Sequence, residues 1–245
     1  MCLLYYEPLG VLIYITKCAR RYAFFSKQTT IYMCYLGIRQ YFINFVSESR
    51  RVMPRLIDIH THHPHPEITS PRMAGIHPWN AEKPRYQPDY ANCDIVGETG
   101  LDYCFPVSRE AQRKLFEEQL QIAAEMDKPV VIHSVKATEE VLRILAKYPM
   151  IRRVVFHGFI GSLQQAETIL KRGYYLSFGE RSLRSPRTRA VIASMDIDRL
   201  FCESDEMPSL SVEEVYSKVA KLREMPLSEL VEAVERNYNR FFAKD

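Results

Sequence analysis

The chain has 245 residues, of which 47% are hydrophobic and 26% are charged, with nine glycines and fourteen prolines. This composition excludes a chain that is disordered throughout, and the length allows one large α/β domain with or without an appendage. The net charge of +3 is uneven, because residues 1–52 contain seven Lys/Arg and two acidic residues, whereas residues 53–245 contain 26 and 28. The larger part therefore has no bulk basic face for sequence-independent nucleic-acid binding.

Residues 1–52 differ from the rest of the chain. They contain seven of the fifteen tyrosines and three of the six cysteines, and they show no steady period of 3.6 or 2. One interpretation is an aromatic, basic arm that faces a membrane or a partner. The other, which we favour, is a segment outside the functional domain that arises from a start codon assigned too early, with Met53 as the natural start. Both interpretations predict an N-terminal extension at 1–52 and a functional domain at 53–245.

The first 52 residues also bear on location. The apolar stretch "LGVLIYI" is far shorter than the ~20 residues of a membrane span. A signal peptide fits poorly, because the positive charges follow the apolar stretch. Six cysteines without the paired spacing of small secreted domains predict reduced thiols. The sequence therefore predicts a cytoplasmic protein without a membrane span.

From Met53 onward, short apolar runs alternate with amphipathic stretches. The runs predict strands at 55–60, 73–77, 94–98, 129–133, 152–157, 174–178 and 199–205, and the stretches predict helices at 109–127, 137–148 and 162–173. In the first helix, Leu115, Gln119, Ile122 and Met126 follow the 3–4 spacing of a buried face. Apolar strands that alternate with helices predict parallel strands joined by crossover helices, and hence an α/β fold.

Side chains that can bind metal ions lie where these predicted strands end. They are, in chain order, His60, His77, Glu98, His133, His157 and Asp205. In a closed (β/α) barrel all these ends meet on one face, where active sites are built. His62 lies two residues after His60, so both imidazoles project to the same side of an extended strand and one ion can take both.

Imidazole and carboxylate ligands together suit Zn, Mn, Fe or, less well, Mg. The set is large enough for two divalent ions, and a pair ~3.5–4 Å apart would activate a bridging water and stabilise developing charge. Taken singly, each residue has a plainer interpretation: Glu98 could cap a helix, and His133 or His157 could be a core histidine. His63 and His65 fall in a proline-broken loop, and we interpret them as rim residues rather than ligands.

The motifs around these residues resemble those of the TatD family of metal-dependent hydrolases and deoxyribonucleases, within the amidohydrolase-like barrels. Residues 56–245 contain seven of them in the family's order: "DIHTH", "AGIHP", "VGETGLDY", "KPVVIHSVKA", "VVFHGFIG", "CESDEMP" and "ERNYNRFF". The resemblance implies a TIM-like barrel, two divalent metal ions and hydrolytic chemistry, often on phosphodiesters. Several members of the family are DNA exonucleases.

The resemblance also implies a role for each residue. One ion would be held by His60, His62 and Asp205, the second by His133 and His157, and Glu98 would bridge both. Asp205 would also act as general base, and His77 would line the substrate side. Asp102 and Glu203 would orient ligands by hydrogen bonds, although Asp102 could equally be a helix N-terminal residue.

The sequence departs from the family pattern after the first strand. Only fourteen residues lie between His62 and His77, and three of them, Pro64, Pro66 and Pro71, make a helix improbable there. The family fits a helix, a strand and another helix into this interval, and a crossover alone needs at least ~10–12 residues. We therefore expect a shortened member with an incomplete barrel of about seven strands, open or patched where the second strand is missing. The first part of residues 1–52 could fill that gap.

Two further departures concern substrate binding. Val135 stands where the family has an arginine, and the following Lys136 could bind substrate or be a plain surface lysine. Ser204 replaces the family's threonine beside Asp205, and Glu206 adds an acidic group that would repel an anionic substrate.

The sequence thus predicts a two-metal hydrolase (with Zn, Mn or Mg) that cleaves phosphodiester bonds, DNA ends in particular, with a metal-activated water. One alternative is a metal-dependent amidohydrolase or esterase that acts on a small non-nucleic substrate, which the near-neutral charge of residues 53–245 and Val135 favour. Another is a metal-binding protein without catalysis.

Overall fold

The computed structural model describes residues 3–4, 13–14, 55–206 and 210–243. The chain divides into two units, residues 1–53 and 54–245. In the first unit, the short strands β1 (Leu3–Leu4) and β2 (Ile13–Tyr14) pair antiparallel. Three predictions concern residues that lie outside this description. They are the aromatic arm, the start at Met53 and the filling of the barrel gap by the N-terminal part.

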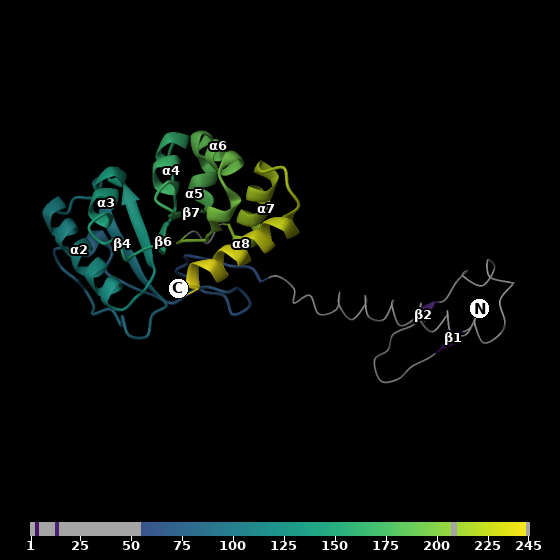
Figure 1. Ribbon diagram of the computed structural model, residues 1–245, viewed down its shortest axis with the longest axis horizontal. Coiled ribbons are helices and arrows are strands. Elements are labelled where there is room, and N and C mark those ends of the chain that lie inside the picture. The colour runs from purple at the N-terminus through teal and green to yellow at the C-terminus, as the bar shows by residue number, and fades with distance from the viewer. Residues whose placement is uncertain (1–2, 5–12, 15–54, 207–209, 244–245) are drawn as a thin grey trace. The chain divides into compact units, whose positions relative to one another are not determined.

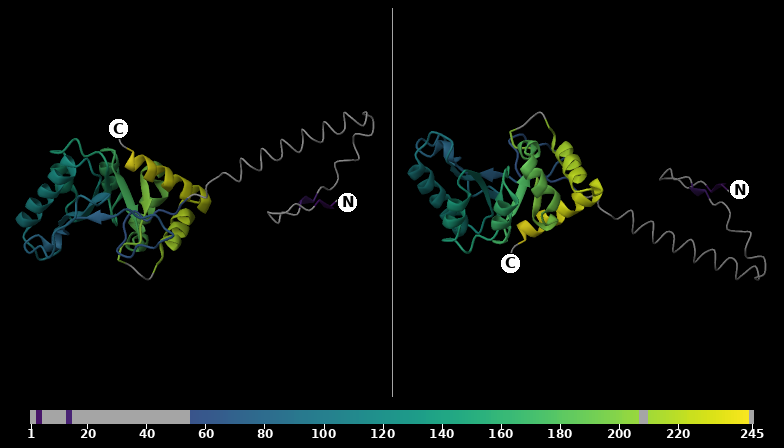
Figure 2. Two further views of the ribbon diagram at one scale, coloured as in Figure 1. Left: turned by 90° about the horizontal axis from the view of Figure 1, so that it is seen from below. Right: turned by 90° about the horizontal axis from the view of Figure 1, so that it is seen from above.

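The second unit is built on one parallel sheet of six strands (Figures 1 and 2). In chain order these are β3 (Met73–Ala74), β4 (Ile95–Asp102), β5 (Val130–Val135), β6 (Val154–Phe156), β7 (Tyr175–Phe178) and β8 (Leu200–Cys202). Each strand pairs with its sequence neighbour, and most strand side chains are buried because helices cover the sheet. The α/β prediction is confirmed, although the run at 55–60 forms no regular strand.

Most of the helices connect successive strands, the last two follow the last strand, and the helices lie outside the sheet (Figure 1). They are α2 (Arg109–Glu125), α3 (Thr138–Leu145), α4 (Leu163–Leu170), α5 (Glu180–Arg184), α6 (Pro186–Ser194), α7 (Val212–Leu222) and α8 (Leu227–Phe242), with 3-10 turns η1 (Pro78–Asn80) and η2 (Ile197–Arg199). Ser162 and Ser211 form capping boxes at α4 and α7. On α2 the buried face includes Phe116 and Leu120, whereas Met126, at its C-terminal end, is exposed. No helix within the described ranges has the length and apolar character that crossing a membrane requires.

The segment that contains His60 lies between β8 and the stretch that leads into β3. It bonds to both and so closes the sheet into a barrel. On one side, the Ile59 N–H donates to the Cys202 carbonyl at 3.2 Å. On the other, the Asp58 N–H donates to the Thr69 carbonyl at 2.9 Å. Residues 63–72 contain no helix. The expected seventh stretch is therefore this irregular segment, and the gap left by the missing strand is patched by direct pairing between residues 57–58 and 69.

Two buried side chains complete the hydrogen bonding that a regular strand would provide. The Tyr216 hydroxyl on α7 accepts from the Ile57 N–H at 3.3 Å and donates to the Ile57 carbonyl at 2.9 Å. The Gln119 amide on α2 bonds the N–H and carbonyl of Ile76 at 2.7 and 2.9 Å, and donates to Thr99 Oγ1 at 2.7 Å. Buried main-chain groups need partners of this kind, so helices α2 and α7 replace part of the missing sheet.

We expect Tyr216→Phe to lower the stability of the second unit by about 1–3 kcal/mol, because it leaves the buried main-chain groups of Ile57 unpaired. At about 2–4 °C per kcal/mol for a unit of this size, the melting temperature should fall by several degrees. Thermal unfolding followed by circular dichroism would measure it. The control is Tyr238→Phe, since the Tyr238 hydroxyl has no hydrogen bond to any described residue. Equal melting temperatures for the two variants would contradict this account of the gap.

Candidate metal centre

Glu98 occupies the middle of the centre because β4 is irregular around it. The pairing of β4 with β5 shifts register between Val96 and Thr99, as in a β-bulge, and bulges re-aim side chains. β4 continues to Asp102, so Glu98 lies within the strand and not at its end as the sequence suggested. Close approach of the two strands requires Gly100, since a Cβ there would collide with the His133 carbonyl oxygen.

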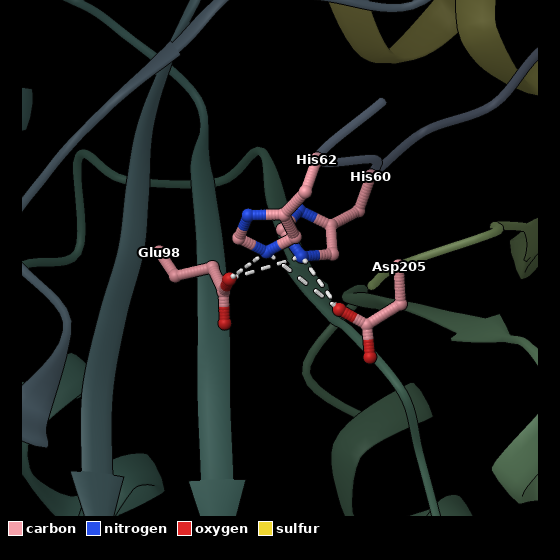
Figure 3. A group of neighbouring side chains, drawn as sticks. All are labelled: His60, His62, Glu98 and Asp205. Atoms are coloured by element: carbon pink, nitrogen blue, oxygen red, sulfur yellow. Dashed lines mark hydrogen bonds and ion pairs between the residues drawn. The ribbon is translucent and has the colours of Figure 1, made fainter. Parts of the chain in front are cut away.

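One oxygen of Glu98 faces a first group of ligands (Figure 3). Glu98 Oε1 lies 3.1 Å from His60 Nε2 and 3.0 Å from His62 Nε2. Asp205 Oδ1 lies 3.4 and 3.8 Å from the same two nitrogens. The two histidines thus project to one side, as the H-x-H spacing predicts. Asp205 reaches them because the two chain segments pair: the His62 N–H donates to the Asp205 carbonyl at 3.2 Å.

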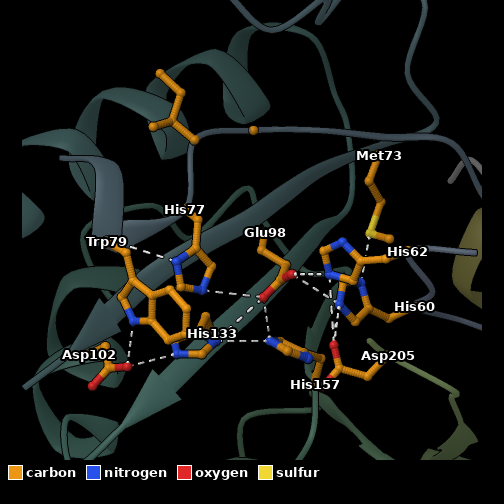
Figure 4. Close-up of polar contacts among 12 residues, drawn as sticks. His60, His62, Met73, His77, Trp79, Glu98, Asp102, His133, His157 and Asp205 are labelled. Carbon is orange, nitrogen blue, oxygen red and sulfur yellow. Dashed lines mark hydrogen bonds and ion pairs between the residues drawn. The ribbon is translucent and has the colours of Figure 1, made fainter. Parts of the chain in front are cut away.

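The other oxygen of Glu98 faces a second group of histidines (Figure 4). Glu98 Oε2 lies 2.8 Å from His157 Nε2, 3.4 Å from His133 Nδ1 and 3.5 Å from His77 Nε2. His133 Nδ1 and His157 Nε2 are 3.1 Å apart. A single carboxylate therefore stands between two sets of histidine nitrogens and presents one oxygen to each.

The polar atoms of these residues are not satisfied by hydrogen bonds to one another, and their chemistry suits divalent cations. His60 Nε2 is fully buried and close to two carboxylates, yet it has no hydrogen-bond geometry to either. His157 Nδ1 and Glu203 Oε1 are also buried without a hydrogen bond. Buried polar atoms without partners are rare and costly. Nitrogen and oxygen ligands in this combination suit Zn, Mn or Fe, so the side chains are positioned to bind metal ions.

The charges of the centre favour a cation. Burial and the neighbouring His157 lower the pKa of His60, but the Asp205 and Glu98 carboxylates outweigh both and raise it to about 9. Burial raises the pKa of Asp205, and the adjacent His60 and His157 bring it down to about 2. The surrounding histidines likewise overcome burial and hold the pKa of Glu98 well below its usual value. The ionised carboxylates would attract metal ions, with which protons compete for the histidines.

Side chains behind the ligands fix which ring nitrogen faces the centre. His60 Nδ1 contacts the Met73 sulfur at 3.3 Å, which leaves Nε2 toward Glu98. His133 Nε2 lies 3.3 Å from Asp102 Oδ2, which leaves Nδ1 toward Glu98, and Asp102 Oδ2 also accepts from Trp79 Nε1 at 2.7 Å. Such outer contacts orient ligands. Asp102 lies in β4 and Ser108 caps α2, so the alternative of a helix N-terminal role for Asp102 is wrong.

We expect Asp102→Asn to weaken metal binding by about 10–100-fold, as is typical when the partner of a metal-binding histidine is removed. The asparagine amide can present its N–H₂ to His133 and so favour the wrong tautomer. Competition with a chromophoric chelator would measure the affinity. Asp198→Asn, at a surface aspartate paired with Arg240, is the control. An unchanged affinity in Asp102→Asn would show that Asp102 does not orient His133.

Three further residues contribute contacts that the sequence did not assign. Asp58, buried within the D-x-H-x-H motif, accepts from the Ser204 N–H at 3.0 Å and from the Ser204 hydroxyl at 2.6 Å. Ser204 Oγ also lies 2.8 Å from Thr61 Oγ1. The serine thus keeps the hydroxyl of the threonine it replaces. Asp58 lies two residues before His60 on the same face, and this alternation was the available signal.

The other predicted site residues lie at different depths. His77 precedes η1 and its Nδ1 accepts from the Trp79 N–H at 3.3 Å, so its Nε2 faces Glu98. His77 and Trp79 line a cavity of about 930 Å³, and the residues of the two candidate ligand groups line it as well. Lys136 is exposed and is not among the residues that line this cavity. His63 and His65 are exposed in the loop after the first ligand pair.

Comparison with known proteins finds relatives that are named as metal-dependent hydrolases or nucleases. The TatD related DNase family matches residues 66–243. An uncharacterized metal-dependent hydrolase of Escherichia coli K12, YjjV, is 33% identical over 162 residues, which are 60% of this chain and 62% of that protein. The human 3'-5' RNA nuclease TATDN2 is 28% identical over 170 residues, which are 60% of this chain and 22% of that protein.

Solved structures agree with the fold. The crystal structure of E. coli YjjV, a TatD homologue, superposes with a TM-score of 0.61 at 25% identity and covers 77% of this chain and 86% of that one. A TatD family hydrolase of Entamoeba histolytica superposes with a TM-score of 0.60 at 17% identity, covering 71% and 75%. The matched regions span less than two thirds of two of the curated relatives, 62% of YjjV and 64% of the Bacillus subtilis hydrolase YabD. With the family match extending over most of its length, this chain belongs to the TatD related DNase family.

Proposed function

We propose that the protein is a metal-dependent hydrolase that cleaves phosphodiester bonds with two divalent cations. The observation that carries this is the position of Glu98, whose two oxygens each face a separate group of histidines. In this proposal His60, His62 and Asp205 hold one ion, His133 and His157 hold the other, and Glu98 contributes to both. All six lie in residues 53–245, which we take as the hydrolase domain, with 1–52 as an N-terminal extension.

When bound, two such ions lower the pKa of a coordinated water and neutralise the charge that develops on phosphate oxygens. The protein's own groups would do the rest. Asp205 is ionised and close to the first ligand pair, so it can take a proton from the attacking water as general base. Burial and the nearby His133 lower the pKa of His77 to about 4, so its ring is neutral. With Nδ1 accepting from Trp79, His77 Nε2–H can donate to a substrate oxygen.

Three observations support a nucleic-acid end as the substrate. The cavity volume of about 930 Å³ is sufficient for a nucleotide unit. Trp79 and Phe105 stack beside the centre with ring centroids 4.5 Å apart, and both are partly exposed. Human TATDN2, which is named as a 3'-5' RNA nuclease, is among the relatives. DNA ends, RNA ends and other phosphodiesters thus belong to one proposed substrate class.

A cytoplasmic location is also part of the proposal. The free thiols of Cys93, Cys104 and Cys202 are in its favour.

A second candidate keeps the metal ions and changes the substrate to a neutral amide or ester. The acidic groups on the cavity wall favour it, since Asp89, Glu180 and Glu206 line the cavity in addition to the ligands. A metal-binding protein without catalysis is the third possibility, and only the absence of turnover on every substrate class would favour it.

The test starts with metal content. Protein purified without an affinity tag should contain about two divalent ions per chain by elemental analysis, and His60→Ala should contain fewer. The loaded protein should shorten a labelled oligonucleotide, and a chelator should stop the reaction until Mn or Zn is restored. Neutral amide and ester substrates are assayed in parallel with the oligonucleotide. Turnover of these alone would replace the phosphodiester proposal by the second candidate, and bound metal without any turnover would leave the third.

A further inference from the structure

Two arginines line the cavity of the candidate metal centre, and they differ in their pairing. Among the described residues the lining includes Arg72 and Arg181 but no lysine. Asp94 accepts from Arg72 through Nε at 3.2 Å, Nη2 at 3.1 Å and the main-chain N–H at 2.9 Å. The exposed guanidinium of Arg181 has no hydrogen bond or ion pair within the described part of the chain. None of the described groups therefore engages its donors.

Arg181 lies in the first turn of α5, which follows β7 directly after Gly179. Gly179 packs so closely on Glu203 that an added Cβ would lie 3.2 Å from both the Cγ and the carbonyl oxygen of Glu203. Ser182 is fully buried, and its hydroxyl accepts from the Gly179 N–H at 3.4 Å. Glu203 lies behind His157, with Oε1 3.8 Å from Nδ1. The main chain that carries Arg181 is thus fixed against the metal centre, which binding sites need for precise placement.

The remaining charged groups on the cavity wall are acidic. They are Asp89, Glu98, Glu180, Glu203, Asp205 and Glu206. Glu180 is paired with Arg184 and Glu203 is fully buried, whereas Asp89 and Glu206 lie outside the candidate metal groups. These two carboxylates would repel an anionic substrate, so a further cation on the wall would favour its binding. The planar guanidinium of arginine donates two parallel hydrogen bonds to phosphate oxygens, which lysine cannot match.

We propose that Arg181 binds a phosphate group of the substrate and thereby selects phosphate esters over neutral substrates. The inference rests on the proposed function, because it takes the metal centre as the place of cleavage and adds the cation that holds the substrate beside it. Two non-bridging oxygens of one phosphate accept from the guanidinium. Val135, which also lines the cavity, offers only apolar surface, and Lys136 is not among the lining residues.

The test measures binding of diethyl phosphate, an unreactive phosphodiester anion, to the metal-loaded full-length protein by calorimetry. Arg181→Ala should weaken binding by about 10–100-fold, the value expected for a charge-assisted contact, and Arg181→Lys should recover part of it. The control is Arg187→Ala, at an exposed arginine of α6 that does not line the cavity; it should bind as the wild type does. Elemental analysis should give the same metal content for all four proteins.

The outcomes distinguish failure of the phosphate site at Arg181 from failure of the proposed function. Equal affinities of wild type and Arg181→Ala, or no binding by the wild type, would overturn the inference. So would oligonucleotide cleavage whose KM is unchanged in Arg181→Ala, although the proposed function would then stand. Binding that depends on Arg181 in a protein that cleaves no phosphodiester would keep the phosphate site and remove the proposed nuclease function. Hydrolysis of any neutral ester should be the same in wild type and Arg181→Ala.

Discussion

Replacement of Glu98 by glutamine is expected to reduce kcat/KM for a phosphodiester by about 10³-fold or more, on the order of 4 kcal/mol of transition-state stabilisation. The reason is geometric. Glu98 presents Oε1 to His60 and His62 and Oε2 to His133 and His157. A carboxamide has one acceptor oxygen, and its N–H₂ group cannot bind a cation, so glutamine can serve only one of the two groups.

Metal analysis separates this explanation from a general loss of structure. The Glu98→Gln protein should contain about one divalent ion per chain or fewer, while its circular dichroism spectrum stays that of the wild type. Glu139→Gln, at an exposed glutamate in the first turn of α3, controls for the loss of a negative charge and should keep full activity and metal content. A Glu98→Gln protein with both ions and normal turnover would refute the bridging role.

The second large effect is expected for Asp205→Asn, which should lower kcat by about 10²–10⁴-fold with little change in KM, the range for removal of a general base. Asparagine keeps the shape and one oxygen of Asp205 but cannot accept a proton at neutral pH. His60, His62 and Glu98 remain to hold the first ion. Steady-state kinetics on an oligonucleotide, together with metal content, would measure both parts of this expectation.

Asp89→Asn is the matched control for Asp205→Asn, because Asp89 also lines the cavity, its carboxylate accepts from Asn92, and it belongs to none of the candidate metal groups. It should leave kcat within about twofold, since surface substitutions away from special features have small effects. If Asp205→Asn loses metal in proportion to its activity, its role as a ligand explains the loss and the base must be sought elsewhere. If neither changes, Asp205 has no role in the reaction.

Much of this centre was readable in the sequence because residues near the carboxyl ends of successive apolar runs converge by topology alone, although Glu98 and His133 lie within β4 and β5 and not at their ends. His60, Glu98, His133 and His157 follow apolar runs, and parallel order brings the ends of those runs to one face. The H-x-H spacing predicted that His60 and His62 share a side, and both indeed approach the same oxygen of Glu98. The α/β class and the absence of a helix between His62 and His77 followed in the same way from periodicity and proline placement.

What the sequence by itself determined, then, is the set of chemical groups and their common face, because strand periodicity and motif order are local properties of the chain. Only the tertiary structure decided that Glu98 lies inside β4 and turns one oxygen to each histidine group, because a bulge depends on the pairing with β5. It also decided how the ring closes. Tyr216, more than 150 residues from Ile57 in the sequence, bonds that residue's main chain, and such long-range contacts follow from packing, which no local pattern encodes.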